Sequence, residues 1–157
     1  FTPAMRAPAI EVFADLPFSL RRATSGLTDP QFDTPYRPGG WTVRQLVHHV
    51  ADSHMNGYIR LKLAVTEDAP TIKPYDQDQW ATLADSALPP QVSLSLLESL
   101  HARWVAVWQA LDPEQYARTF QHPELGPMTV DTHLHLYAWH CRHHLAHITG
   151  LRERNDW

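Results

Sequence analysis

The sequence predicts an all-α protein, a single domain covering residues 1–157 and built as a four-helix bundle. Four segments of about 15–25 residues carry apolar side chains at three- and four-residue spacing, which is typical of amphipathic helices. The thirteen prolines fall mostly between these segments, and the alternating pattern of a strand is weak throughout. At 43% hydrophobic residues, a chain of this length can bury one substantial core.

The first two predicted helices cover residues 8–27 and about 42–66. Pro17 falls inside the first helix, where we expect a kink or a break because proline lacks an N–H and clashes with the preceding turn. A turn-rich segment then separates the two helices. Thr42 and Gln45 have the spacing of a capping box and would start the second helix.

The second half of the chain supplies two more long helices. A short helix is predicted over 77–83, and a cleanly amphipathic one follows over 94–111. The proline-rich connection after it has room for a short irregular or hairpin-like insertion near 118–128. Thr129 is a good N-cap for the last helix, and Gly150 would provide its C-cap.

Composition excludes several classes of protein. The formal net charge is −4, from 13 Lys and Arg against 17 Asp and Glu, so nucleic-acid binding has little support. Neither a signal peptide nor an apolar run of about 20 residues is present, which argues against a membrane protein. A single cysteine, Cys141, excludes a disulfide framework and suits the reducing cytoplasm. Because the chain begins with Phe1 rather than Met, we expect this position not to be the natural start.

Histidine is the unusual feature. The chain has eleven, and six of them lie from His133 to His147 in the last predicted helix. At about 100° per residue, four of these point to one face that is otherwise apolar, and His135 points nearly the opposite way. The four are His133, His140, His144 and His147. Burying so many imidazoles without partners would cost several kcal/mol, and a metal ion would remove that cost.

The spacing on this helix suits a metal ion. Two histidines four residues apart can bind one ion, and both His140/His144 and His143/His147 meet that condition. The third ligand would come from the second helix, which offers His48, His49 and His54. Periodicity places His54 on the apolar stripe, His49 at its edge and His48 on the far side. It therefore favours His54 slightly over His49. Three imidazoles leave a coordination position open, as catalytic sites do.

Two blocks of the sequence resemble a known family. The run 39–56 (GGWTVRQLVHHVADSHMN) and the run 139–148 (WHCRHHLAHI) are similar to the DinB-like superfamily, in particular to its YfiT branch of metal-dependent hydrolases. The resemblance covers nearly the whole chain. It implies the DinB-type four-helix bundle, in agreement with the pattern of helices.

The resemblance also implies a ligand set. In that family one histidine of the second helix and a pair on the fourth hold the metal, which here corresponds to His49, His140 and His144. This replaces the periodicity preference for His54. One divalent metal per chain is expected, with Zn²⁺ preferred and Ni²⁺ as the alternative. His143, His147 and His54 would then flank the pocket as catalytic acid–base groups or as simple hydrogen-bond partners.

Three functions follow from such a centre. A metal can bind a small thiol as its thiolate, and the branch resembles enzymes that transfer bacillithiol, so the first expectation is a thiol S-transferase in detoxification. A metal can also activate water, which gives a hydrolase. The third possibility is a metal-binding stress protein without catalysis. The expected partners are a small thiol or an electrophilic substrate, and the resemblance implies a homodimer.

Other candidate residues have plainer explanations. Cys141 is predicted to be a buried core thiol rather than a nucleophile, because no Cys-His-Asn arrangement accompanies it. Three tryptophans at core spacing are predicted to pack the interior: Trp104, Trp108 and Trp139. The segment 36–41 could form a lid over the pocket or simply a rigid turn between helices.

Overall fold

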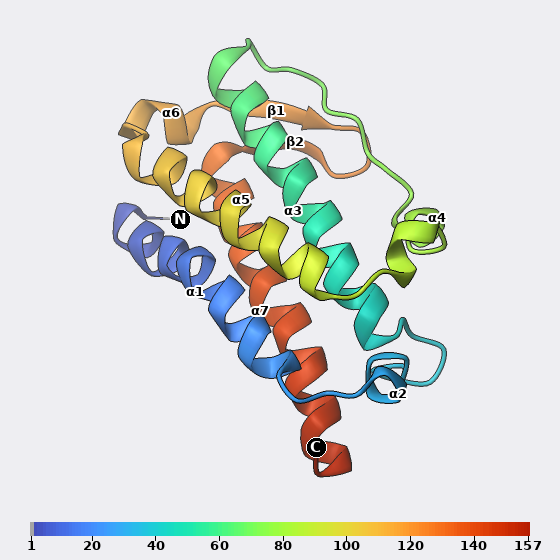
Figure 1. Cartoon of the computed structure of the whole chain (residues 1–157). Helices are drawn as coiled ribbons and strands as arrows, with labels where there is room; N and C mark the ends of the chain where they lie inside the picture. The colour runs from blue at the N-terminus through green and yellow to red at the C-terminus, as the bar shows by residue number, and fades with distance from the viewer. Residues whose placement is uncertain (1) are drawn as a thin grey trace.

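Four long helices form the bundle in a computed structural model that describes residues 2–157 (Figure 1). They are α1 (Arg6–Thr24), α3 (Val43–Thr66), α5 (Gln91–Ala110) and α7 (Val130–Asn155). The prediction of an all-α four-helix bundle is therefore confirmed.

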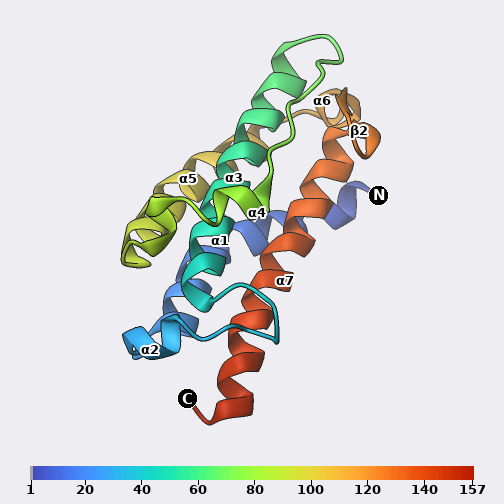
Figure 2. The ribbon, with the colours of Figure 1, turned by 90° about the vertical axis from the view of Figure 1, so that its right-hand side faces the viewer.

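The long helices are connected across the diagonals of the bundle. Both α1 and α3 pack against α5 and α7, so α1 and α3 occupy opposite corners. Consecutive long helices therefore cross from corner to corner between α1 and α3, and again between α5 and α7. The two views of the ribbon show α7 running beside both α1 and α3 (Figures 1 and 2). This arrangement places the histidine-rich helix α7 directly against α3.

Short elements fill the connections. They are a 3-10 turn at Pro3–Met5, α2 (Asp29–Phe32), α4 (Gln77–Trp80), a second 3-10 turn at Ala84–Ala87, α6 (Pro113–Ala117), and the strands β1 (Thr119–His122) and β2 (Gly126–Thr129). The strands pair as an antiparallel hairpin with Phe120 opposite Met128, which confirms the predicted insertion before the last helix. The helix expected over 77–83 ends earlier, at Trp80.

Proline does not split the first helix. Pro17 lies inside α1, which continues to Thr24. A proline removes one backbone donor and leaves the carbonyl four residues earlier without its helical partner. Here that carbonyl belongs to Phe13, and it contacts Nδ1 of His101 at 2.7 Å. A side chain from α5 thus replaces the missing hydrogen bond, so the helix tolerates its proline.

The last helix extends beyond the predicted end. Gly150 was expected to be the C-cap, but α7 continues to Asn155, and Asp156 takes the left-handed conformation at φ 55°. Tertiary contacts carry the helix past the glycine. Leu151 is buried, and the Arg152 guanidinium donates to the carbonyl of Ala23 at 2.8 Å. The propensity penalty of one glycine, about 1 kcal/mol, is small beside such contacts.

A polar layer divides the core. One apolar cluster includes Phe13, Trp104 and Tyr137, and the other includes Leu20 and Leu97. Three histidines lie near the boundary between the two clusters: His54 on α3, His101 on α5 and His140 on α7. The bundle is thus apolar towards both ends and histidine-rich at the level between them.

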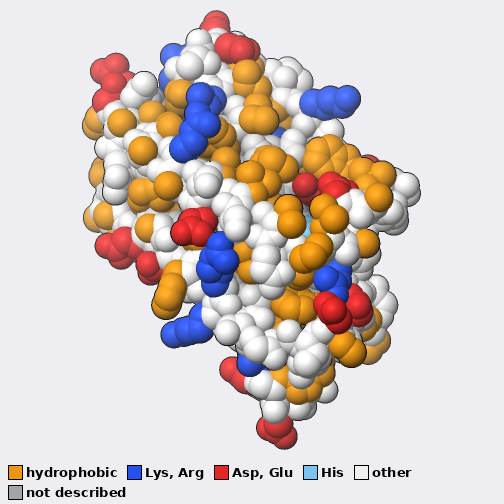
Figure 3. Space-filling model, viewed as in Figure 1, with side chains coloured by type: hydrophobic (Ala, Val, Ile, Leu, Met, Phe, Trp, Pro, Cys, Tyr) orange, Lys and Arg blue, Asp and Glu red, His pale blue; other side chains and the backbone are white. Residues whose placement is uncertain are grey.

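The charged groups on the surface are mixed. On the face seen in Figure 3, Lys and Arg side chains lie apart from one another among acidic ones, and no continuous basic surface forms there. Within residues 2–157, no helix combines the length and the apolar character needed to cross a bilayer.

A pair of glycine substitutions tests the close approach of α3 to α7. A Cβ added at Gly57 would lie 2.5 Å from the Tyr137 ring and 2.6 Å from Trp104. Gly57→Ala is therefore expected to lower the free energy of unfolding by about 1–3 kcal/mol through overpacking. Gly150→Ala, whose Cβ meets nothing closer than 3.4 Å, should instead gain up to about 1 kcal/mol from helix propensity. Urea denaturation measures both, and equal stability of the two variants would contradict the packing described here.

Candidate metal centre

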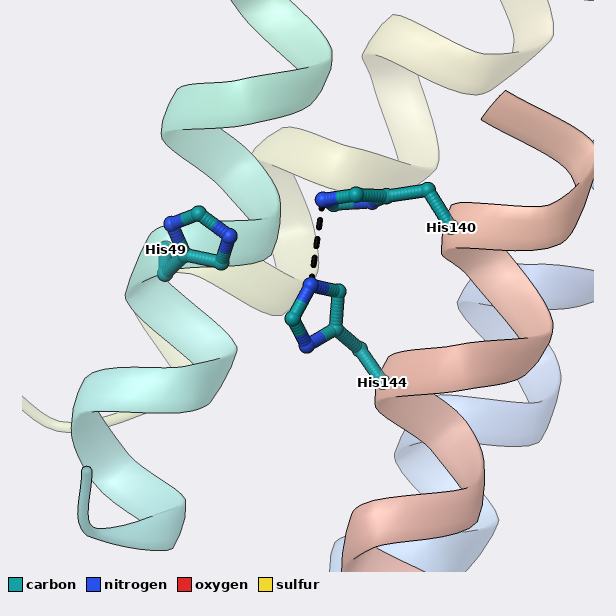
Figure 4. A group of neighbouring side chains, drawn as sticks. All are labelled: His49, His140 and His144. Atoms are coloured by element: carbon teal, nitrogen blue, oxygen red, sulfur yellow. Dashed lines mark hydrogen bonds between the residues drawn. The ribbon is translucent and has the colours of Figure 1, made fainter. Parts of the chain in front are cut away.

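Three histidines from two helices converge between α3 and α7. Figure 4 shows His49 on α3 facing His140 and His144, which lie one turn apart on α7. One ring nitrogen from each lies within 4.8 Å of the others. A capping box fixes the start of α3, because the Thr42 side chain accepts from the Gln45 backbone N–H and the Gln45 side chain accepts from Thr42.

Burial keeps these imidazoles neutral. Desolvation lowers the pKa of His49 to about 4 and that of His140 to about 3. Desolvation and then the neighbouring histidines also lower the pKa of His144. Near pH 7 each ring therefore keeps a lone pair on one nitrogen, which is the form that binds a metal ion.

The hydrogen bonding of this cluster is incomplete, and a cation would complete it. The Nε2 atoms of His140 and His144 lie 3.0 Å apart, so only one of them can carry a hydrogen. Nδ1 of His144 is buried and has no hydrogen-bond partner, which is rare in folded proteins. Three neutral imidazoles with unused lone pairs fit a divalent metal ion.

The second histidine pair of α7 lies beside this cluster. His143 and His147 approach each other at 3.0 Å between their Nε2 atoms. Together with His144 they form another group whose ligand atoms lie within 4.8 Å. Trp139 stacks on His143 and Tyr36 stacks on His147, with ring centroids 4.5 and 4.1 Å apart. Both groups contain His144, but only the group with His49 joins two helices.

Two other histidines of α3 lie outside both groups. His54 is fully buried, with Nε2 3.0 Å from Nδ1 of His140, so it lies behind the cluster and belongs to neither metal-binding group. This position is unsuited to direct contact with a substrate. His48 was placed on the far side of α3 but is also buried. Its Nε2–H donates to the Leu88 carbonyl and its Nδ1 accepts from Ser93, which ties α3 to the start of α5.

Two cavities border the histidine cluster and share part of their lining. The first, of about 440 Å³, is lined by His49, His140, His143 and His144 together with Tyr36, Arg37, Gly39, Gly40, Trp41, Gln77, Asp78 and Trp139. The second, of about 570 Å³, is lined by Ser53, Arg60, Pro74, Tyr75, Asp76, Gln77, His122, Glu124 and His140. His140 and Gln77 border both. A larger cleft of about 890 Å³ surrounds Arg44 but contains no histidine, so the chemistry points to the first two.

Sequence reasoning missed part of this lining. Trp139 was expected to pack the core, but it is 51% exposed and borders the first cavity, whereas Trp104 and Trp108 are buried as predicted. Trp41 lies over His49 with ring centroids 4.5 Å apart, so the segment 36–41 covers the cavity. The position of Trp139 beside His143 on the helical wheel was a signal for this.

Arg60, His101 and His122 were also missed. His101 could have been found, since it follows the apolar stripe of α5 and must face inward. Arg60 and His122 lie on α3 and β1, and no local pattern links them. Cys141 is 1% exposed and burial raises its pKa, as expected for a core thiol.

Comparisons with known proteins agree with this architecture. A Bacillus mycoides protein is 58% identical over 148 residues, and an Oceanobacillus iheyensis protein is 54% identical over 148 residues. Each alignment covers 94% of this chain and 86% of the relative. Both relatives are provisionally named metal-dependent hydrolases. YfiT from Bacillus subtilis, described as a probable metal-dependent hydrolase with an unusual four-helix bundle topology, matches with a TM-score of 0.97 at 48% identity. That match covers 100% of this chain and 91% of YfiT.

The match to a family covers the histidine cluster itself. The sequence model of the DinB superfamily matches residues 16–148, a segment that contains His49, His140 and His144. The matched segment covers most of the chain, and the chain belongs to the DinB superfamily.

Proposed function

We propose that this chain is a metal-dependent enzyme that transfers a small thiol, of the bacillithiol type, to an electrophilic substrate. The observation that carries the proposal is the convergence of three neutral imidazoles beside two cavities that share part of their lining. His49, His140 and His144 would hold one divalent metal, with Zn²⁺ preferred and Ni²⁺ as the alternative. Such a metal lowers the pKa of a thiol or of a water molecule.

The two cavities give room for two reactants. His140 borders both, so a thiol entering one cavity and an electrophile entering the other would meet at the cluster. Arg60 lines the second cavity, and among residues 2–157 no carboxylate lies within ion-pair distance of it. Its Nε is buried without a hydrogen-bond partner. One Arg60 amino group donates to the Lys73 carbonyl at 3.2 Å, and a guanidinium without a carboxylate partner suits the carboxylate of a thiol co-substrate.

The histidine pair on α7 can handle the proton. His143 lines the first cavity and contacts His147 through Nε2. Desolvation and then His143 and Arg37 lower the pKa of His147, so that it is neutral near pH 7 and can accept a proton. In the proposed step the thiol gives its proton to this pair. Its sulfur forms a C–S bond as the leaving group departs with the bonding electrons.

Hydrolysis is the second candidate. It is favoured by the names of the relatives from Bacillus and Oceanobacillus and by the description of YfiT. The same metal would activate water in place of a thiol. Hydrolysis needs water and one organic substrate, so this candidate assigns no second organic reactant to the cavity around Arg60.

An assay with both reaction types separates the candidates. Zinc-loaded protein, incubated with bacillithiol and monobromobimane, is expected to form the thioether faster than metal-free protein, and to leave p-nitrophenyl acetate unhydrolysed. Arg60→Met should raise KM for bacillithiol by about tenfold or more, the worth of one charge-assisted hydrogen bond, and leave KM for uncharged 2-mercaptoethanol unchanged. Metal-dependent ester hydrolysis without thioether formation would favour the hydrolase instead.

A further inference from the structure

A chain of hydrogen bonds crosses the core and ends at the candidate metal ligand His140. Nδ1 of His140 lies 3.0 Å from Nε2 of His54, and Nδ1 of His54 lies 2.7 Å from Nε2 of His101. Nδ1 of His101 in turn lies 2.7 Å from the carbonyl oxygen of Phe13. His54 and His101 are 0% and 1% exposed, so water does not compete for these contacts.

Pro17 makes the end of this chain available. In an unbroken helix the backbone N–H of residue 17 would donate to the carbonyl of Phe13, but proline has no N–H. The freed carbonyl is the one that His101 reaches from α5. The buried histidine of α5 thus supplies the hydrogen bond that the proline inside α1 cannot donate.

The carbonyl determines the direction of every hydrogen bond in the chain. A carbonyl oxygen can only accept, so His101 carries its hydrogen on Nδ1, and its Nε2, as in any neutral imidazole, is an acceptor. Nδ1 of His54 must then be the donor to His101, which leaves Nε2 of His54 as an acceptor. Nδ1 of His140 donates to that acceptor, so Nε2 of His140 carries no hydrogen. Complete burial keeps the two intermediate rings neutral, as this argument requires.

We propose that His101 and His54 are positioning residues that hold His140 in the tautomer whose Nε2 is free to bind a metal ion. This proposal rests on the metal centre proposed above. Ligand histidines commonly donate their other N–H to a carbonyl or a carboxylate. Here two imidazoles, one from α3 and one from α5, connect His140 to a main-chain carbonyl of α1. Consistently, the groups near His140 Nε2 are possible donors: Ser53 Oγ at 3.3 Å and His144 Nε2 at 3.0 Å.

Removing the His101 side chain tests this series of hydrogen bonds. In His101→Phe the His54 Nδ1–H loses its acceptor, so His54 is expected to carry its hydrogen on Nε2 and donate to His140. His140 is then held in the wrong tautomer, and Zn²⁺ affinity should fall by about 10–100-fold. His101→Gln, whose amide oxygen can accept from His54, should retain most of the affinity. Competition for Zn²⁺ with a chromophoric chelator measures all three proteins.

His133→Phe is the matched control. His133 is also fully buried in the core, and its Nε2–H donates to the Gly57 carbonyl at 2.9 Å, but it has no hydrogen bond to His140. It should lose folding stability as His101→Phe does, without the loss of Zn²⁺ affinity. An equal fall in affinity in both variants would overturn the proposal.

The tautomer itself can be observed without metal. Ring ¹⁵N shifts of metal-free wild type are expected to show His140 protonated at Nδ1 and bare at Nε2, and His101→Phe should shift this population. A wild-type His140 protonated at Nε2 would overturn the proposal whatever reaction the protein catalyses. Conversely, a correct tautomer together with bound metal and no thioether formation would contradict only the proposed function.

Discussion

Replacing His140 and His144 by alanine is expected to abolish metal binding, whereas the wild-type chain should carry about one divalent ion. Both side chains belong to the cluster with His49, in which His49 and His144 are buried and His140 is partly buried. Because loss of an outer hydrogen-bond partner already costs about 10–100-fold in affinity, loss of two direct ligands should exceed that range. Elemental analysis of protein purified without a histidine tag and reconstituted with Zn²⁺ or Ni²⁺ measures the stoichiometry.

Single variants then identify which histidine group holds the ion. His49→Ala should lose the metal, and His147→Ala should keep it, because only His49 completes the cluster that joins α3 and α7. His135→Ala serves as the control on the same helix, since His135 belongs to neither group. If only His147→Ala lost the metal, the second group, with His143, His144 and His147, would be the metal site. A wild type that takes up neither metal would refute the proposed function altogether.

Metal binding without either reaction would point to the third possibility, a metal-binding protein without catalysis. In that case a fourth ligand should close the coordination sphere. The cluster has no fourth histidine nitrogen within 4.8 Å of all three ligand atoms among the described residues. The geometry therefore favours an open centre over a storage site.

The helices were predictable because their signals are local. The Thr42–Gln45 capping box and the apolar spacing of α5 depend on residues a few positions apart. The end of α7 was not predictable from local signals. Its continuation past Gly150 depends on hydrogen bonds from Arg152 to carbonyls about 130 residues away in the sequence.

The candidate site was predictable only in part, for the same reason. The i, i+4 spacing of His140 and His144 follows from helix geometry and needs no partner. The choice between His49 and His54 depends on the level at which α3 crosses α7. Periodicity gives the face of a helix on which a residue lies, but not this level. Both histidines turn out to face α7, with His49 in the cluster and His54 behind it. The preference for His49 as a ligand came from the family resemblance and not from the spacing.

Metal-free protein is expected to lose about 4 kcal/mol of stability between about pH 7 and pH 5 through two buried histidines alone. Desolvation lowers the pKa of His101 and of His133 to about 4, from an ordinary value of 6.5. Below 6.5 the unfolded chain binds a proton at each position that the folded protein does not bind. The free energy of unfolding therefore falls as the pH drops from 6.5 towards 4, by about 1.4 kcal/mol per unit for each group.

This loss is a substantial part of a typical stability of about 5–15 kcal/mol, so metal-free protein should unfold at clearly lower urea concentration at pH 5 than at pH 7. Urea denaturation at the two pH values measures it. His133→Phe removes one of the two groups and should reduce the acid-dependent loss by about 2 kcal/mol, although the variant is less stable at neutral pH. A stability that stays constant between these pH values would contradict the neutral, dry environment described for the buried histidines. The chain of hydrogen bonds needs that same environment. A proton added to His54 or His101 would turn the acceptor nitrogen of that ring into a donor, and the hydrogen bonds would no longer follow in one direction.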